Sequence, residues 1–151
     1  MQFVQLLSDK PNVMKIKALI LSISLFCAFS LVQAQCENEI IMCEKYFTQE
    51  YISDGQTYRA LIHNDQIAEF DITLFSGNTY RFTSCSGGAE GNLVFRLFDE
   101  QKNQLFSNQN FSNAPYWDFV VETTIDVTVE AQLDINKLES GCALLLIGFK
   151  K

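Results

Sequence analysis

The sequence predicts an all-β protein: an antiparallel two-sheet β-sandwich of about eight or nine strands, with a jelly-roll or Ig-like layout. The first observation is the alternation of apolar and polar residues through residues 70–99, because a period of two places the apolar set on one face of a strand. The second is a turn signal about every 8–12 residues, the spacing of sandwich strands. The third is that no 11-residue window shows a convincing helical period.

The front of the chain has the pattern of a secretory signal peptide over residues 1–34. Lys15 and Lys17 precede an apolar run, 18–32, and small Ala34 follows it, so cleavage is expected between Ala34 and Gln35. The run is shorter than the roughly 20 residues of a membrane-spanning helix. We therefore expect no stable membrane span after cleavage.

Two details refine the expected start of the exported chain. Residues 1–13 are mixed and polar, and Met14 directly precedes the basic flank, so we expect Met14 to be the initiator and 1–13 an upstream extension. Cys36 lies two residues past the expected cut, which raises lipidation as an alternative. Since Gln35 occupies the position where a lipoprotein signal has a small residue, soluble release to the extracellular space or periplasm is the prediction.

Residues 35–151 are predicted to form one domain. Removing 1–34 takes away three lysines and one aspartate, so the formal charge falls from −7 to −9. An acidic product does not attract phosphate backbones, which argues against nucleic acid as a partner.

Four cysteines remain after the signal peptide is removed, and they predict two disulfides in an oxidising compartment. They are Cys36, Cys43, Cys85 and Cys142. No C-x-x-C pair is present and His63 is the single histidine, so the pattern is not that of a zinc site. Three connectivities remain open; we favour Cys36–Cys43 with Cys85–Cys142.

The first half of the domain is expected to begin with a strand or one helical turn at 37–44. Strands are then predicted wherever apolar residues alternate between turn residues. The turns carry Ser-Asp-Gly, His-Asn-Asp and Ser-Gly-Asn, and the strands they separate are 46–52, 56–62, 67–75 and 79–85.

The second half follows a flexible glycine-rich loop at 86–91. Its cleanest strand is 124–133, where apolar and polar residues alternate without interruption, as in a strand with one solvated face. The polar stretch 134–141 is expected to connect it to the last strand. The strands of this half are 92–99, 104–111, 116–121, 124–133 and 142–149.

Four segments in this order resemble the bacterial pre-peptidase C-terminal type of β-sandwich. They read FDITLF, SGNTYRF, GNLVFRLFD and GCALLLIGF, and the likeness covers roughly 58–149. The resemblance implies an extracellular accessory domain that is usually appended to secreted hydrolases and is not itself catalytic. This chain differs from that pattern in its cysteines and in having no enzyme attached.

No catalytic motif is visible. The chain has no G-x-S-x-G, H-E-x-x-H, Walker loop or G-x-G-x-x-G, and no cofactor is predicted. The lone His63 lies in a turn sequence and is expected to face solvent. Neighbouring carboxylates leave a carboxylate-based hydrolase as the weakest alternative.

One loop combines amide and aromatic residues suited to sugar recognition. We predict a ligand site at Asn108, Asn110, Asn113, Tyr116 and Trp117, where an aromatic face would stack on a sugar ring and amides would bind its hydroxyls. Alternation allows only one of Tyr116 and Trp117 to face the core, and Tyr116 is predicted to be the outward one. The alternative is that the aromatic residues are core and the amides only shape the loop.

A second candidate is the outward row Asp126, Thr128 and Glu130, with 99–100 nearby. Calcium would need about six or more converging oxygens, so a solvated strand face is the preferred interpretation and no metal site is predicted. The function predicted from the sequence is a secreted, non-catalytic accessory or interaction domain whose partner is an extracellular glycan or protein. A carbohydrate-binding module is the alternative.

Overall fold

The computed structural model describes residues 36–87 and 90–150. The chain divides into two units, 1–34 and 35–151, and the fold is that of the second. The expected signal peptide, its cleavage site and Met14 all lie outside the described residues. No helix among the described residues is long and apolar enough to cross a membrane.

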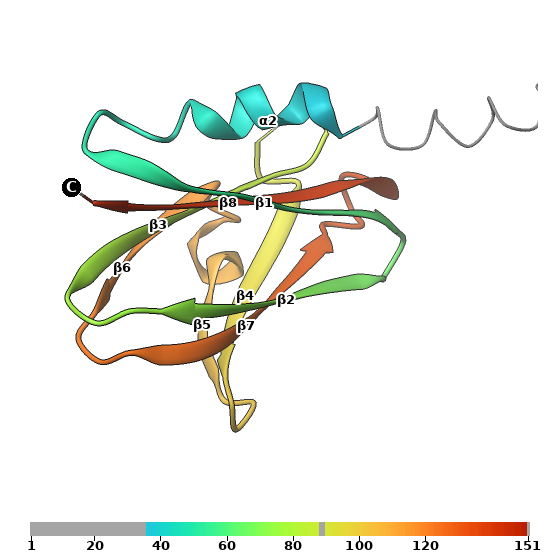
Figure 1. The fold of residues 1–151 in the computed structure, drawn as a ribbon. Helices are drawn as coiled ribbons and strands as arrows, with labels where there is room; N and C mark the ends of the chain where they lie inside the picture. The colour runs from blue at the N-terminus through green and yellow to red at the C-terminus, as the bar shows by residue number, and fades with distance from the viewer. Residues whose placement is uncertain (1–35, 88–89, 151) are drawn as a thin grey trace, which may run out of the picture. The chain divides into compact units, whose positions relative to one another are not determined.

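Eight antiparallel strands form two four-stranded sheets, as the alternation predicted (Figure 1). Sheet A has the order β1-β8-β3-β6 and sheet B the order β2-β7-β4-β5, which is the jelly-roll arrangement. The strands are β1 (Tyr51–His63), β2 (Ile67–Leu74), β3 (Asn78–Cys85), β4 (Leu93–Asp99), β5 (Gln104–Ser107), β6 (Tyr116–Val121), β7 (Ile125–Leu133) and β8 (Ser140–Lys150).

The main core lies between the inner faces of the two sheets. Sheet B contributes every second residue of its strands, as in the run Val127, Val129, Ala131 and Leu133, each 3% exposed or less. Sheet A contributes aromatic and aliphatic side chains on the facing side. The buried members of the largest cluster are Leu74, Tyr80, Phe82, Phe95, Leu97, Val121, Val127, Val129, Leu145 and Ile147.

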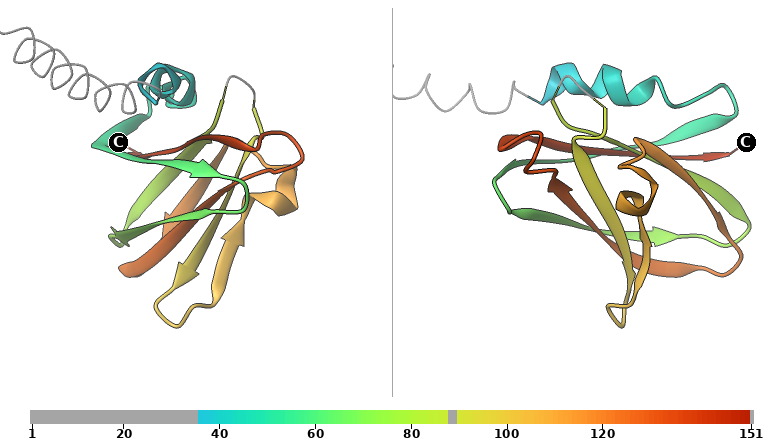
Figure 2. Two further views of the ribbon diagram at one scale, coloured as in Figure 1. Left: turned by 90° about the vertical axis from the view of Figure 1, so that its right-hand side faces the viewer. Right: turned by 180° about the vertical axis from the view of Figure 1, so that it is seen from behind.

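Strand β8 is apolar on both faces, and both faces are covered. Helix α2 (Glu37–Glu44) lies over its outer face, on the outside of sheet A. The helix contacts β3 and β8, and Figure 2 shows it on the outer side of that layer. Leu144 and Leu146 pack outward against Cys43, with Phe47 against the same cluster. An uninterrupted apolar run is the sequence pattern of a strand buried on both sides.

The predicted number of disulfides is confirmed, but the favoured pairing is wrong. The bonds join Cys36 to Cys142 and Cys43 to Cys85, with Cα–Cα distances of 5.6 and 5.8 Å. Residues 37–44, expected to be a strand or one helical turn, are helical, and this decides the pairing. Cys36 and Cys43 are seven residues apart along the helix, which separates them by about 10 Å. A disulfide joins Cα atoms only about 4.4–6.8 Å apart, so each cysteine pairs with a strand beneath the helix.

The predicted strand 46–52 is wrong for residues 46–50, which are turns and irregular backbone. Its last two residues and the predicted strand 56–62 belong to one strand, β1, rather than to two strands joined by a turn. The Ser-Asp-Gly sequence instead produces a register shift between Ser53 and Thr57 along β8. Gly55 has φ +81°, and Asp54 Oδ1 accepts from the Gln56 N–H at 2.8 Å. Residues typical of turns therefore make an irregularity in a continuous strand.

The predicted strand 104–111 ends early, at Ser107. A 3-10 helix, η1 (Asn108–Phe111), follows directly. The Ser107 hydroxyl accepts from the Gln109 N–H at 3.3 Å, which caps the helix start. A serine followed by amide residues competes with the sheet ladder through such local hydrogen bonds.

Candidate functional site

The amide-rich loop connects β5 to β6, and its first asparagine is buried. Asn108 is 0% exposed. Its Oδ1 accepts from the Phe95 N–H at 2.9 Å, and its Nδ2 donates to the carbonyls of Leu93 and Ala114 at 3.0 and 3.1 Å. The side chain therefore ties the loop to β4, and it does not lie where it could bind a ligand hydroxyl as predicted.

Asn113 is also committed to the fold. It is 9% exposed, and its Nδ2 donates to the Gly91 carbonyl at 3.1 Å and to Asp134 Oδ2 at 3.0 Å. Asn110 is the predicted loop asparagine that is exposed. The predicted amide set thus separates into two structural ties and one surface side chain.

Trp117 faces the core side of β6 and belongs to a group of four aromatic residues that we call the aromatic edge: Phe106, Phe111, Trp117 and Phe119. The Trp117 ring lies 4.2 Å from Phe111 and 5.1 Å from Phe106, between centroids. Phe106 meets Phe119 edge-to-face at 5.0 Å. Phe111, on η1, is 47% exposed, so the aromatic edge reaches from the core to the surface.

Tyr116 faces outward, on the side of sheet A opposite to Trp117, as alternation predicts. It is 41% exposed. Its ring centroid lies 5.4 Å from that of Tyr46, which precedes β1. Tyr116, the predicted stacking residue, and Trp117 therefore lie on opposite faces of β6 and belong to two different surfaces.

Arg81, on β3, holds the tyrosine side of this edge together. Its Nε and Nη2 donate to the two carboxylate oxygens of Asp118 at 2.6 and 2.7 Å, and its Nη1 donates to the Tyr46 carbonyl at 2.8 Å. The guanidinium carbon lies 4.2 Å from the Tyr51 centroid and 4.6 Å from that of Tyr116. We call these five residues the tyrosine–arginine cluster.

The electrostatics of this cluster follow from the bidentate pair. Hydrogen bonds from Arg81 hold the pKa of Asp118 below its usual value, against the effect of partial burial. The same bonds raise the pKa of Arg81. Because three nitrogens of Arg81 already donate within the chain, the guanidinium acts as a fixed tie rather than as an anion receptor.

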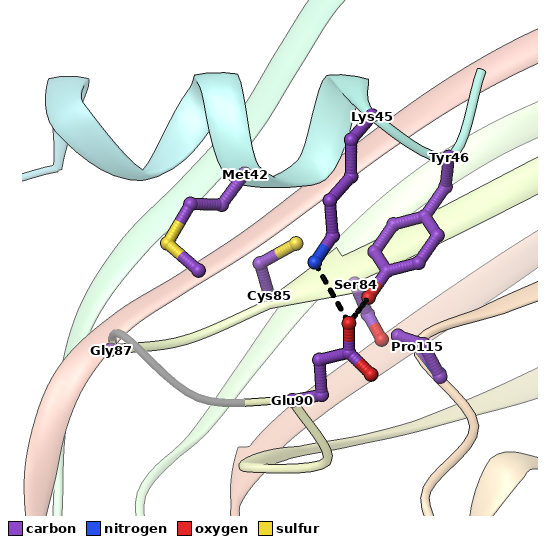
Figure 3. A pocket seen from close by; sticks show the side chains of 8 residues that line it. All are labelled: Met42, Lys45, Tyr46, Ser84, Cys85, Gly87, Glu90 and Pro115. Carbon is purple, nitrogen blue, oxygen red and sulfur yellow. Dashed lines mark hydrogen bonds and ion pairs between the residues drawn. The ribbon is translucent and has the colours of Figure 1, made fainter.

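A second polar contact joins the end of α2 to the glycine-rich loop. Figure 3 shows Lys45 and Tyr46 both pointing toward Glu90. Oε1 of Glu90 lies 2.8 Å from Lys45 Nζ and 2.5 Å from the Tyr46 hydroxyl. These hydrogen bonds, first that from Lys45, lower the pKa of Glu90. The contact fixes Tyr46 beside Tyr116.

An open apolar groove of about 370 Å³ runs between the edges of the two sheets, beside the aromatic edge. Its walls include Leu105 and Phe106 from β5 and Phe119 and Val120 from β6. Leu105 is 50% and Val120 76% exposed. We call it the edge groove. Clustered apolar exposure of this kind is a mark of an interaction surface.

The predicted row Asp126, Thr128 and Glu130 lies on the outer face of sheet B, and its first two members hydrogen-bond to side chains of β2. Thr73 Oγ1 donates to Asp126 Oδ1 at 2.5 Å, and Thr128 Oγ1 donates to Asp71 Oδ1 at 2.9 Å. No group of three or more His, Cys, Asp or Glu able to hold a metal ion occurs among residues 36–87 and 90–150.

Sequence reasoning did not identify Arg81, Tyr46 or Tyr51 as members of a surface cluster. A charged residue in the middle of the aromatic strand Thr79–Phe82 was the available signal. Its partners come from segments 30 or more residues away along the chain, so their meeting depends on the strand order and not on local spacing.

No family model and no curated protein sequence matches this chain. Among solved structures it aligns with Aeromonas hydrophila PliG, a periplasmic lysozyme inhibitor of g-type lysozyme. The alignment covers 69% of this chain and 91% of PliG, with 11% identity and a TM-score of 0.49. Similarity this low transfers neither fold nor function, so the inhibitory role remains a statement about PliG.

Proposed function

We propose that this chain is an exported, non-catalytic β-sandwich that binds an extracellular partner at the β5–β6 edge. The observation that carries the proposal is the edge groove, along which Leu105 is 50% and Val120 76% exposed. Exposing these side chains to water costs free energy that a partner would recover on binding.

The tyrosine–arginine cluster supports the same surface. Tyr116 is held between Tyr46 and Arg81, so its ring has little freedom left to lose when a partner binds. Tyrosine and tryptophan fixed in this way are the residues that most often dominate binding energy at protein interfaces.

Export is supported by the two disulfides, which persist in oxidising compartments. We retain the likeness to pre-peptidase C-terminal domains as a proposal, since it implies the same accessory role. We infer a non-catalytic role because the walls of the edge groove are mainly apolar, whereas hydrolysis by carboxylates requires two of them facing each other across a cleft.

The proposal can be tested by placing a charge in the edge groove. Leu105→Lys should abolish co-isolation of the partner from the extracellular fluid of the producing cells. Thr73→Lys, a change at another exposed position, on the outer face of sheet B, is the matched control and should leave co-isolation intact. Equal recovery with both variants would count against this edge.

A carbohydrate-binding module is the second candidate, and the exposure of Tyr116 and Asn110 favours it. A glycan array would be run with the exported protein and with Tyr116→Ala. Binding that disappears in the variant while the fold persists would support a sugar site. The absence of any bound glycan would retire it.

A further inference from the structure

Three of the four sheet edges carry features that discourage pairing with another strand. The β1 edge is interrupted by the register shift between Ser53 and Thr57. The β2 edge bears the exposed carboxylates of Glu69 and Asp71. The β5 edge is only four residues long, Gln104–Ser107, and its pairing with β4 is irregular.

The fourth edge, β6, has none of these features. Its register with β3 runs without a shift from Asn78↔Val121 to Thr83↔Tyr116. The strand contains no glycine, proline or lysine. Its one charge, Asp118, is already neutralised by the bidentate pair with Arg81.

The backbone of β6 offers regularly spaced hydrogen-bonding groups on its outer side. The Pro115 carbonyl accepts from the Ser84 N–H of β3 at 2.7 Å, so residues of the same parity direct their backbone groups toward β3. Since these directions alternate along an antiparallel pair, the N–H and C=O groups of Tyr116, Asp118 and Val120 point away from the sheet.

The edge groove lies directly beside this row. A strand added to β6 would direct alternate side chains to opposite faces, and its inward set would enter the space bounded by Leu105 and Phe119. The outward set would lie next to Tyr116 and Val120. Backbone pairing and side-chain pockets thus occur together, which is the requirement for strand addition by a peptide.

We propose that β6 receives an extended peptide with alternating apolar residues and a cationic end as a fifth strand of sheet A. This deepens the proposed function and rests on it. Glu122, exposed at the end of β6, also lines the groove and would pair with the cationic end. A second copy of this chain fits less well, because two exported chains of formal charge −9 each would repel one another.

The test uses two fluorescein-labelled probes, the peptides KVTVTVK and EVTVTVE, titrated against the exported protein by fluorescence anisotropy. The cationic peptide should bind at least about tenfold more tightly than the acidic one. Val120→Pro removes one outward N–H without touching the β3 ladder and should weaken binding about tenfold. Val120→Thr, which keeps the N–H and the branched shape, should bind within about twofold of the wild type.

Hydrogen exchange on the wild-type protein keeps the proposal testable if Val120→Pro fails to fold. Peptide should slow exchange at the amides of Tyr116, Asp118 and Val120. Protection elsewhere, no binding by the cationic peptide, or a dimer that Val120→Pro dissociates would each overturn strand addition. If Leu105→Lys still removes the extracellular partner while the peptides fail, the proposed function stands and only this inference falls.

Discussion

Removing the Cys43–Cys85 disulfide should destabilise the domain by about 4 kcal/mol. The bond closes a loop of 42 residues, and the chain-entropy relation for a loop of that length yields about 4 kcal/mol at 25 °C. For a domain of this size that corresponds to a fall of about 12–20 °C in melting temperature. The double variant Cys43→Ala/Cys85→Ala is the perturbation, and thermal unfolding followed by circular dichroism is the assay.

The same cysteines distinguish the two pairings. Cys43→Ala/Cys85→Ala should contain no free thiol, because Cys36 and Cys142 remain bonded to each other. In contrast, Cys36→Ala/Cys43→Ala should leave two free thiols, at Cys85 and Cys142, whose partners have been removed. Alkylation and mass spectrometry would measure both. Two free thiols in the first variant and none in the second would refute the reasoning from helix geometry.

Three further predictions concern single residues. The pKa of Asp118 lies below its usual value of 3.8, so its pair with Arg81 contributes stability that is present above pH 3.8 and lost as the pH falls through the lowered pKa. The difference in melting temperature between the wild type and Asp118→Asn should therefore narrow below about pH 4. A difference that stays constant with pH would contradict this. Gly148→Ala would bring a Cβ within 2.8 Å of Phe47 Cε1 and 2.9 Å of the Ile52 carbonyl oxygen, and it should cost about 1–3 kcal/mol in urea unfolding. Unchanged stability would show that both the Phe47 ring and the β1 backbone shift freely. Asn108→Ala removes the hydrogen-bond partner of three backbone groups, two of them buried and one partly buried, and should destabilise the domain by about 3 kcal/mol. Asn110→Ala, the exposed control, should change stability by less than about 0.5 kcal/mol.

Most of the sandwich could be predicted because its signals are local. In strands such as β7, apolar and polar residues alternate cleanly, and the apolar face packs against the core between the sheets. The irregularity at Ser53–Thr57 could not be predicted, because Ser-Asp-Gly suits a turn and a bulge equally well. Whether these residues form a turn or a bulge depends on whether β8 extends far enough to pair with both halves of β1, as it does.

The candidate site was predictable only in part. Alternation correctly separated outward Tyr116 from inward Trp117. It could not reveal that Asn108 is buried, because the burial comes from backbone groups of β4, 13 to 15 residues earlier in the chain. Arg81 likewise gains its role only when the strand order places β6 and the segment before β1 on either side of it.

The central claim is that a partner binds the β5–β6 edge, and site-specific crosslinking measures this most directly. The photoreactive residue p-benzoylphenylalanine would be placed at position 120 and, in a separate variant, at position 73 on the outer face of sheet B. Irradiation in the extracellular fluid of the producing cells should yield one discrete adduct from position 120 and none from position 73. No adduct at position 120, or equal adducts from both positions, would contradict the claim.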